Sequence, residues 1–280
     1  SRTVTDQTCP RARYFEYAYG GHGLAPIEKD IALTFGSAIA DAAEAIRQGK
    51  PVPAYGGALP WSSLYAGLTE AYRTRIWPKW AANHELIATE VECTIALSPE
   101  VTYMARPDAI VRRHSDQTYW YLQDKTSSLS PDQFAHGWDK LPELHATAKA
   151  IQQSLGLEIS GAYVQGWYKG YLKNGTLYSP LAYAWRKYEA PIAYPGQKTS
   201  QWSFEYRAGW ERRPSTDMDV VVWVNSLPEP VIQQQFPVSA PIMIRPDLAD
   251  RYLAQVLRRE QWVELVRTSG LSEAAQREQF

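Results

Sequence analysis

The sequence predicts an α/β protein, because apolar residues follow a helical period near both ends of the chain and a period of two in its middle. Residues 27–48 place apolar side chains three and four positions apart, and Gly49 and Pro51 end this stretch. A second helix is predicted near 61–82. From residue 86 onward, apolar side chains alternate with polar ones, which is typical of strands.

Three strands are predicted between residues 86 and 125, arranged as an antiparallel meander. Alternating apolar residues cover 86–97 and again 101–112. A polar turn over 114–117 then leads to a third strand, from Thr118 to Lys125. Because short connections join antiparallel neighbours, this part of the chain is expected to form the core of a sheet.

The segments after residue 125 are predicted to include helix, strand and loop. Ser130-Pro131-Asp132 opens a helix, because proline is favoured in the first helical turn. Asn174-Gly175 is a strong signal for a hairpin turn. In order, we expect a helix to about Leu155, a strand over 159–168, a hairpin over 171–189, loops over 190–217, a short buried strand over Val220–Val224 and a helix over 246–268.

The composition excludes several classes of protein. The 280 residues suit one large domain, and a net charge of −1 argues against a histone-like protein that neutralises phosphates over its whole surface. Cys9 and Cys93 lack the CxxC spacing of zinc knuckles and iron–sulfur clusters. No apolar run approaches the roughly 20 residues that span a bilayer, and the N-terminus does not resemble a signal peptide. We therefore expect no membrane partner and a reducing, cytoplasmic location.

A carboxylate, an amide and an ammonium group are predicted to meet at one end of the sheet. Residues i and i+2 of a strand point to the same face, so Gln123 and Lys125 share a face and Asp124 points the other way. If the neighbouring strands pair through the polar turn, Asp108 lies opposite this pair. A one-residue slip would instead bring Asp124 to this face and turn Lys125 away, unless a bulge keeps both.

The strand before Asp108 adds a second acidic residue. Glu90 and Glu92 share a face, and we assign Glu90 to the site in preference to Glu92. Mg²⁺ and Mn²⁺ prefer oxygen ligands of this kind, and Mg²⁺ keeps several bound waters. Such a cation polarises a phosphoryl oxygen and activates water, and a neighbouring lysine orients that water. Together with Gln123 and Lys125, the two acids indicate hydrolysis of phosphodiesters.

These residues also carry a resemblance to a family. Over roughly residues 8–170 the chain resembles the PD-(D/E)xK nucleases, and among them the RecB-like exonucleases with their phage and CRISPR-associated relatives. Pro107-Asp108 matches the Pro-Asp pair, Gln123-Asp124-Lys125 lies where (D/E)xK belongs, and Glu90 matches the acid one strand earlier. Further segments resemble other motifs of the family: Thr8–Tyr14 the N-terminal Cys-Pro-Arg segment, Phe35–Ala40 the Gly-x-x-x-His helix motif, Trp138–Thr147 the downstream helix and Ile159–Val164 the following strand.

The resemblance implies a restriction-endonuclease-like fold, in which helices flank a central mixed β-sheet. It places a nuclease-like core in residues 1–170 and an extension of hairpin, loops and terminal helix in 171–280, packed on the same domain. It implies a DNA nuclease dependent on Mg²⁺ or Mn²⁺, an exonuclease or end-processing enzyme of repair or recombination in a prokaryote or phage. Glu90, Asp108 and Gln123 would bind the metal, with Asp108, Gln123 and Lys125 as the catalytic set. A homo-oligomer and a helicase or recombination partner both stay open.

Contacts with DNA are assigned to two groups of residues. Arg11 and Arg13 are candidates to hold phosphate groups, and ion pairing with acidic side chains is an equal alternative. Thr126 and Ser127 follow the lysine and are candidates for hydrogen bonds to a phosphate backbone. The isolated His145 is interpreted as a structural residue and not as a metal ligand.

Several positions depart from the family pattern. Ala40 stands where the helix motif has His, and Gln123 is an amide where the third motif has an acid. Glu143 and Thr147 replace the downstream Gln and Tyr, and Cys9 lacks the partners found in cluster-binding members. Because these changes lower the charge available to a metal, an alternative hypothesis is a nuclease fold that binds nucleic acid or assembles with a partner without cutting. A structural phage-type protein is a third hypothesis.

Overall fold

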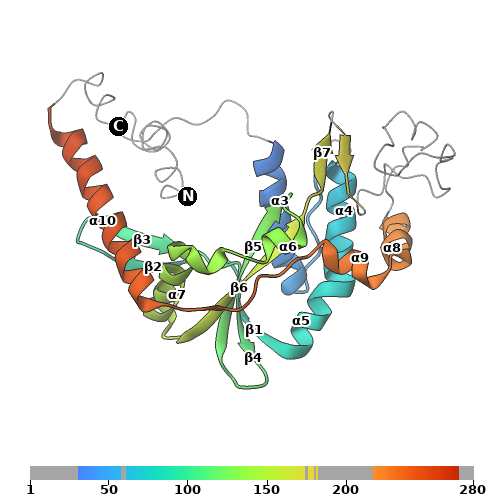
Figure 1. Cartoon of the computed structure of the whole chain (residues 1–280), viewed down its shortest axis with the longest axis horizontal. Helices are drawn as coiled ribbons and strands as arrows, with labels where there is room; N and C mark the ends of the chain where they lie inside the picture. The colour runs from blue at the N-terminus through green and yellow to red at the C-terminus, as the bar shows by residue number, and fades with distance from the viewer. Residues whose placement is uncertain (1–30, 58–60, 174–175, 180, 182–216, 271–280) are drawn as a thin grey trace.

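A five-stranded mixed β-sheet forms the centre of the protein in the computed structural model, which describes residues 31–57, 61–173, 176–179, 181 and 217–270. β5 and β6 are parallel, and the other neighbouring strands are antiparallel. Helices lie on both faces of the sheet (Figure 1), which confirms the predicted α/β class and the central mixed sheet flanked by helices. The order of the strands across the sheet is β1 (His84–Ala88), β4 (Ala109–Arg113), β5 (Tyr119–Ser127), β6 (Ile159–Tyr168) and β9 (Ile242–Met243).

One side of the sheet, which we call the α3 face, packs against the first described helices. α3 (Ile31–Arg47) and α4 (Trp61–Ala71) share a buried apolar cluster, and a π-helical turn (Tyr72–Ile76) joins α4 to α5 (Trp77–Asn83). The predicted helices over 27–48 and 61–82 are therefore confirmed within the described residues. Trp167 of β6 is fully buried in this cluster, with its ring centroid 4.4 Å from that of Tyr72.

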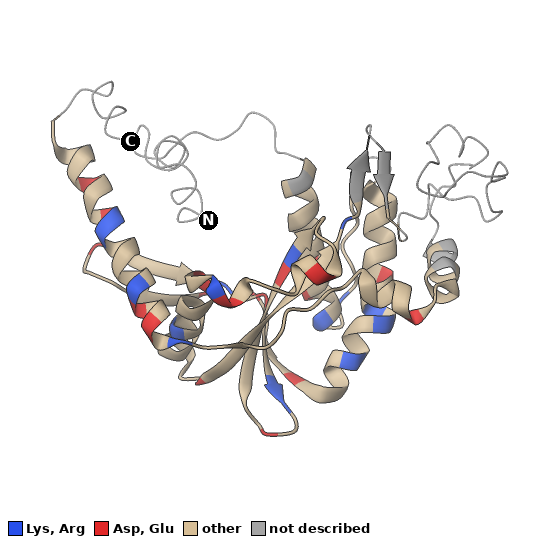
Figure 2. Cartoon of the chain, viewed as in Figure 1, with Lys and Arg blue, Asp and Glu red and all other residues tan. Residues whose placement is uncertain are grey.

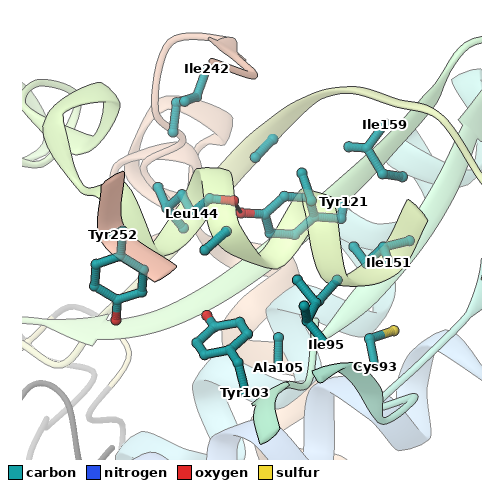
Figure 3. Close-up of a cluster of buried hydrophobic side chains, with 14 of the residues drawn as sticks. Cys93, Ile95, Tyr103, Ala105, Tyr121, Leu144, Ile151, Ile159, Ile242 and Tyr252 are labelled. Carbon is teal, nitrogen blue, oxygen red and sulfur yellow. Dashed lines mark hydrogen bonds between the residues drawn. The ribbon is translucent and has the colours of Figure 1, made fainter. Parts of the chain in front are cut away.

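The other side, the α7 face, packs against α7 (Pro142–Leu155), the hairpin of β2 (Cys93–Ala96) with β3 (Thr102–Ala105), and the first half of α10 (Pro246–Thr268). Figure 3 shows the apolar cluster on this face, in which Tyr121 of β5 points toward Leu144 of α7. The hydroxyl group of Tyr121 donates a hydrogen bond of 2.6 Å to the backbone oxygen of Leu144. The cluster therefore fixes α7 across the sheet.

The predicted meander is wrong, because the stretches over 86–97 and 101–112 each divide into two strands. β1 and β4 belong to the central sheet, whereas β2 and β3 form a separate hairpin. Glu90 interrupts the first stretch with a φ of 49°, which an extended strand does not allow. Pro107 lies in the second interruption, where its missing N–H cannot join a ladder. The predicted pairing of the next two strands, β4 with β5, is observed.

The predicted helix over 131–155 is also divided. α6 (Pro131–Phe134) begins at a capping box in which the Ser130 side chain accepts from the N–H of Gln133, and a 3₁₀ turn (Trp138–Lys140) precedes α7. Gly137 causes the interruption, because its φ of 88° lies outside the helical region. The helix ends at Gly156 as predicted, in the left-handed conformation that glycine favours at this position.

The predicted buried strand over Val220–Val224 is wrong, because these residues belong to α8 (Asp217–Ser226). Val220 and Val224, one helical turn apart, are buried, whereas Val222 between them is 56% exposed. That spacing fits a helix, and a short apolar run in the sequence does not separate the two structures. α9 (Glu229–Gln234) follows, and α10 has the bounds predicted for the terminal helix.

Several described segments after residue 170 belong to the central sheet or to the apolar clusters on its faces. β7 (Tyr171–Lys173) and β8 (Thr176–Tyr178) pair as a hairpin within the range predicted, 171–189; the turn at 174–175, residue 180 and residues 182–216 lie outside the described residues. Residues 235–239 run along β6, with backbone hydrogen bonds of 2.6 Å from Gly166 N to Pro237 O and 2.9 Å from Tyr168 N to Gln235 O. β9 then pairs with β6 on the same edge.

Charged residues of both signs are interspersed along α10 (Figure 2), which packs against α7. This distribution gives the described surface of α10 a mixed rather than a basic character. Of the helices that the structure describes, none combines the length and the apolar character that crossing a membrane requires.

Candidate functional site

Asp108 lies one residue before β4 and is only 8% exposed. Its Oδ2 atom accepts a hydrogen bond of 2.6 Å from the backbone N–H of Asp124 and another from the side-chain amide of Gln123. The register explains the contact, because Ala109 is paired with Leu122 and the next position along each strand is Asp108 and Gln123. The two strands therefore bring these two side chains together, as expected from the sequence.

Successive side chains of β5 point to opposite faces of the sheet around Gln123. Leu122 packs in a small cluster with Trp120, against Trp77 and Trp80 of α5 on the α3 face, and Tyr121 packs into the cluster on the α7 face. Gln123 and Lys125 therefore lie on the α7 face and Asp124 on the α3 face, so the one-residue slip is not observed. Lys125 is exposed, and it has no ion-pair partner among the described residues.

Glu90 provides a second carboxyl group at Asp108. The negative charge of Glu90 contributes to a raised pKa at Asp108, and the pKa of Glu90 is itself raised, first by burial. The pKa of Asp108 is raised well above its usual value, first by burial and then by the negative charge of Asp124. Ionising two neighbouring carboxyl groups in a partly buried setting carries an electrostatic cost, which raises the pKa of both groups. Glu92 is about half exposed and lies 3.6 Å from Arg106, whereas it is Glu90 whose charge acts on Asp108.

The residues assigned to DNA contacts lie in different places. Thr126 is on the α3 face, where a Cβ atom added to Gly36 would be 3.4 Å from its hydroxyl oxygen. Ser127 alternates to the side of Lys125, and its hydroxyl accepts from the N–H of Leu129 over 3.0 Å. Arg11 and Arg13 lie outside the described residues. Of the two described side chains, neither Thr126 nor Ser127 takes part in the hydrogen bonds of Asp108.

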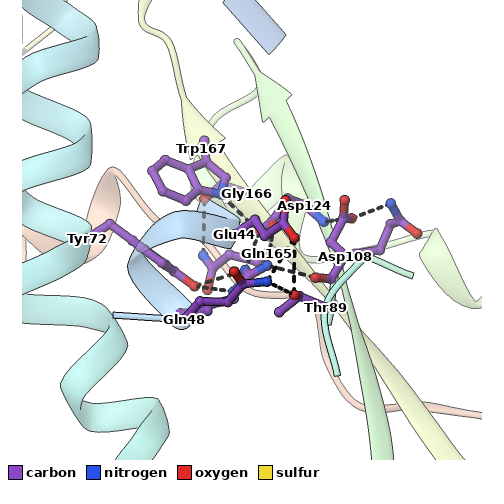
Figure 4. A network of polar contacts seen from close by, with 11 residues as sticks. Glu44, Gln48, Tyr72, Thr89, Asp108, Asp124, Gln165, Gly166 and Trp167 are labelled. Carbon is purple, nitrogen blue, oxygen red and sulfur yellow. Dashed lines mark hydrogen bonds and ion pairs between the residues drawn. The ribbon is translucent and has the colours of Figure 1, made fainter. Parts of the chain in front are cut away.

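A buried polar network on the α3 face was not anticipated from the sequence. Figure 4 shows Asp124 between Trp167 and Asp108, with Tyr72 on the far side of the network. Arg47 joins them, since its guanidinium group pairs with the Asp124 carboxylate at 2.7 Å and donates to the hydroxyl of Tyr72. An arginine at the end of an amphipathic helix carries no signal of burial in the sequence, because that position is normally solvated.

Glu44 of α3 is a further residue that the sequence analysis missed. Its carboxylate accepts hydrogen bonds from Gln48 over 2.9 Å and from Thr89 over 3.3 Å, and its negative charge contributes to the raised pKa of Glu90. The sequence did contain a sign of this residue. Ala40 stands where the family motif has His, and Glu44 follows it by one helical turn, so that both lie on the same face of the helix.

Two carboxyl groups and one amide at this site fit a hard divalent cation that keeps several of its waters. Asp108 and Glu90 supply carboxylate oxygens, and a half-turn of the Gln123 amide presents its oxygen in place of its nitrogen. Within the described residues, no group of three or more His, Cys, Asp or Glu side chains is placed to hold a metal ion. The described residues therefore offer a cation few negatively charged ligands.

No protein-family model and no curated protein sequence matches this chain.

Proposed function

We propose that this protein is a DNA nuclease dependent on Mg²⁺ or Mn²⁺, acting as an exonuclease or end-processing enzyme. The observation that carries the proposal is the hydrogen bond between Gln123 and the buried Asp108, whose pKa is raised in part by the nearby charge of Glu90. Asp108 would bind the cation directly, Glu90 directly or through water, and Gln123 through its amide oxygen. Lys125 lies two residues further on the same face; its exposed ammonium group, which has no ion-pair partner in the part of the chain that the structure describes, would be available to a water or a phosphate.

The raised pKa values favour this interpretation. When Asp108 and Glu90 are both ionised without a cation, they repel each other in a partly buried setting, and Asp124 adds to the repulsion at Asp108. A divalent cation would relieve the repulsion and favour the ionised carboxylates, so that binding would release protons from groups whose pKa is raised. Such electrostatic cost in the metal-free protein is typical of ligand sites.

Hydrolysis requires that a water oxygen bonds to phosphorus while one ester P–O bond breaks, leaving a phosphate monoester and a hydroxyl group. The bound cation supplies polarisation of the phosphoryl oxygen and a lowered pKa for water. Asp108 and Glu90 would hold this cation. Lys125 orients the water and stabilises the negative charge that develops on the phosphoryl oxygens.

End-labelled single-stranded and double-stranded DNA tests the proposal directly. We expect cleavage with Mn²⁺ that is abolished by a chelator, by Asp108→Ala and by Glu90→Ala. Glu92→Ala is the matched control, because this neighbouring acid is exposed and pairs with Arg106, and it should keep wild-type activity. Equal cleavage by the wild type and Asp108→Ala would refute the assignment.

A second candidate is a nuclease-like protein that binds nucleic acid or assembles with a partner without cutting. The orientation of Gln123 favours it, because the amide nitrogen already donates to Asp108 and two carboxyl groups alone bind a cation weakly. This candidate predicts a shift of labelled DNA in a gel in the presence of chelator, with no cleavage in Mn²⁺.

A further inference from the structure

Arg47, the last residue of α3, is buried behind the candidate site with its side chain 1% exposed. Nη1 and Nη2 contact the two carboxylate oxygens of Asp124 at 2.7 and 2.9 Å. Nε and Nη2 donate to the hydroxyl of Tyr72 over 3.1 and 2.9 Å. Nη1 also donates to the backbone oxygen of Asp108 over 3.4 Å. The guanidinium group therefore meets both carboxylate oxygens of Asp124, one through a hydrogen bond and one through an ion-pair contact, and these two contacts fix orientation as well as distance.

Asp124 links this arginine to the carboxyl group of Asp108. The Asp124 side chain is 4% exposed and also accepts a hydrogen bond of 3.0 Å from Nε1 of Trp167. Its backbone N–H points in a different direction and donates to Oδ2 of Asp108 over 2.6 Å (Figure 4). We call the four residues Arg47, Tyr72, Asp124 and Trp167 the Arg47 clamp. The clamp lies on the α3 face, whereas the Gln123 side chain that contacts Asp108 lies on the α7 face.

We propose that Arg47 is a positioning residue for the candidate site: by fixing the Asp124 side chain and the Asp108 backbone, it sets the N–H of residue 124 against the Asp108 carboxyl group. Asp108 precedes β4 and lies outside its ladder, so these contacts with β5 orient its side chain. The inference rests on the proposed role of Asp108 in binding a cation. It adds a residue that would touch neither cation nor substrate.

A purely stabilising role for the ion pair is the alternative. The net contribution of a buried ion pair is often small, because the cost of removing both charges from water offsets their attraction. Removing one partner leaves a buried charge and unfolds many proteins, whereas replacing both with apolar side chains is often tolerated. The double variant Arg47→Met/Asp124→Leu therefore removes the clamp without leaving an unpaired charge.

The first measurement uses the metal-free protein and does not depend on the proposed function. The short hydrogen bond to a carboxyl group should shift the ¹H resonance of the residue 124 amide downfield and slow its exchange with solvent. We expect both effects to be lost in the double variant and reduced in Arg47→Lys, which keeps the charge but not the two-point geometry. A wild-type amide resonance in both variants would overturn the proposal. Arg47→Lys keeps the test decisive if the double variant does not fold.

The second measurement is the affinity for Mn²⁺ alone, followed by the electron paramagnetic resonance of the free ion. Loss of a residue that supports a metal ligand typically weakens binding by about 10- to 100-fold, and we expect a loss in this range for the double variant. The matched control is Arg75→Met/Glu229→Leu, which removes a partly buried ion pair between the π turn and α9 and should leave Mn²⁺ affinity unchanged. If the wild type binds no Mn²⁺, the proposed function fails and the amide measurement alone decides the role of Arg47. Wild-type Mn²⁺ affinity in a folded double variant would overturn the positioning role.

Discussion

Replacing Asp108 with asparagine is expected to stabilise the metal-free protein at neutral and alkaline pH while abolishing cation binding. The pKa of Asp108 is raised in the folded protein, first by burial and then by the charge of Asp124. An asparagine oxygen can accept the same hydrogen bonds from Gln123 and from the N–H of Asp124. The substitution therefore removes a carboxyl group that is difficult to ionise and keeps its contacts.

The sign and size of the effect follow from proton linkage. The stability that the protonated Asp108 contributes is fully present below the unfolded-state pKa of about 3.9. It is lost as the pH rises toward and through the raised pKa of the folded state, because the unfolded chain releases the proton first. Within this window the wild type should lose about 1.4 kcal/mol per pH unit relative to Asp108→Asn. Above the folded-state pKa of Asp108 the difference should become constant.

Urea unfolding from pH 4 to 9, followed by tryptophan fluorescence in the presence of chelator, measures this difference. Asp116→Asn is a control of opposite sign, because hydrogen bonds from the Arg113 guanidinium hold the pKa of that exposed carboxyl below its usual range. Asp116 contributes stability above the unfolded-state pKa, so its variant should not gain stability as the pH rises. Parallel stability curves for the wild type and Asp108→Asn would refute the reasoning about buried charge at this site.

Three further changes have defined outcomes. Gln123→Glu should strengthen Mn²⁺ binding by adding a third carboxylate, and unchanged affinity in a titration would count against its assignment as a ligand. His145→Ala should lower the free energy of unfolding by about 1–3 kcal/mol, because this buried ring accepts a hydrogen bond of 3.2 Å from the backbone N–H of Arg245. An unchanged midpoint of urea unfolding would contradict this. Gly161→Ala should destabilise by about 1–3 kcal/mol in the same assay, since the new Cβ would lie 2.3 Å from the Trp120 ring, and a neutral result would mean that the ring moves freely.

Elements with a sustained period were predicted well from the sequence. The strand over 159–168 and the helix over 246–268 have the predicted bounds. The errors lie where one residue overrides the period. Glu90 turns the chain out of the sheet, and Gly137 divides a helix, through backbone angles that an apolar pattern does not record. Val222 belongs to an apolar run that is too short to distinguish strand from helix.

Only part of the candidate site could be predicted from the sequence. The proximity of Asp108 and Gln123 follows from strand alternation and a short turn, which are local properties of the sequence. The burial of Arg47 and its pairing with Asp124 join residues 77 positions apart, and they depend on how α3 crosses the sheet. No period or spacing encodes that contact, so it required the structure.

A chain cut after residue 170, near the predicted end of the nuclease-like core, would lack the segment that pairs with one side of β6. The backbone groups of Gly166 and Tyr168, which bond to residues 235–239, would then face solvent beside buried apolar side chains. Unprotected strand edges of this kind recruit strands from other molecules. Fragments that stop before Met243 are therefore expected to aggregate during expression. A shortened chain that folds by itself would have to keep β9, which pairs with β6 at this edge of the sheet.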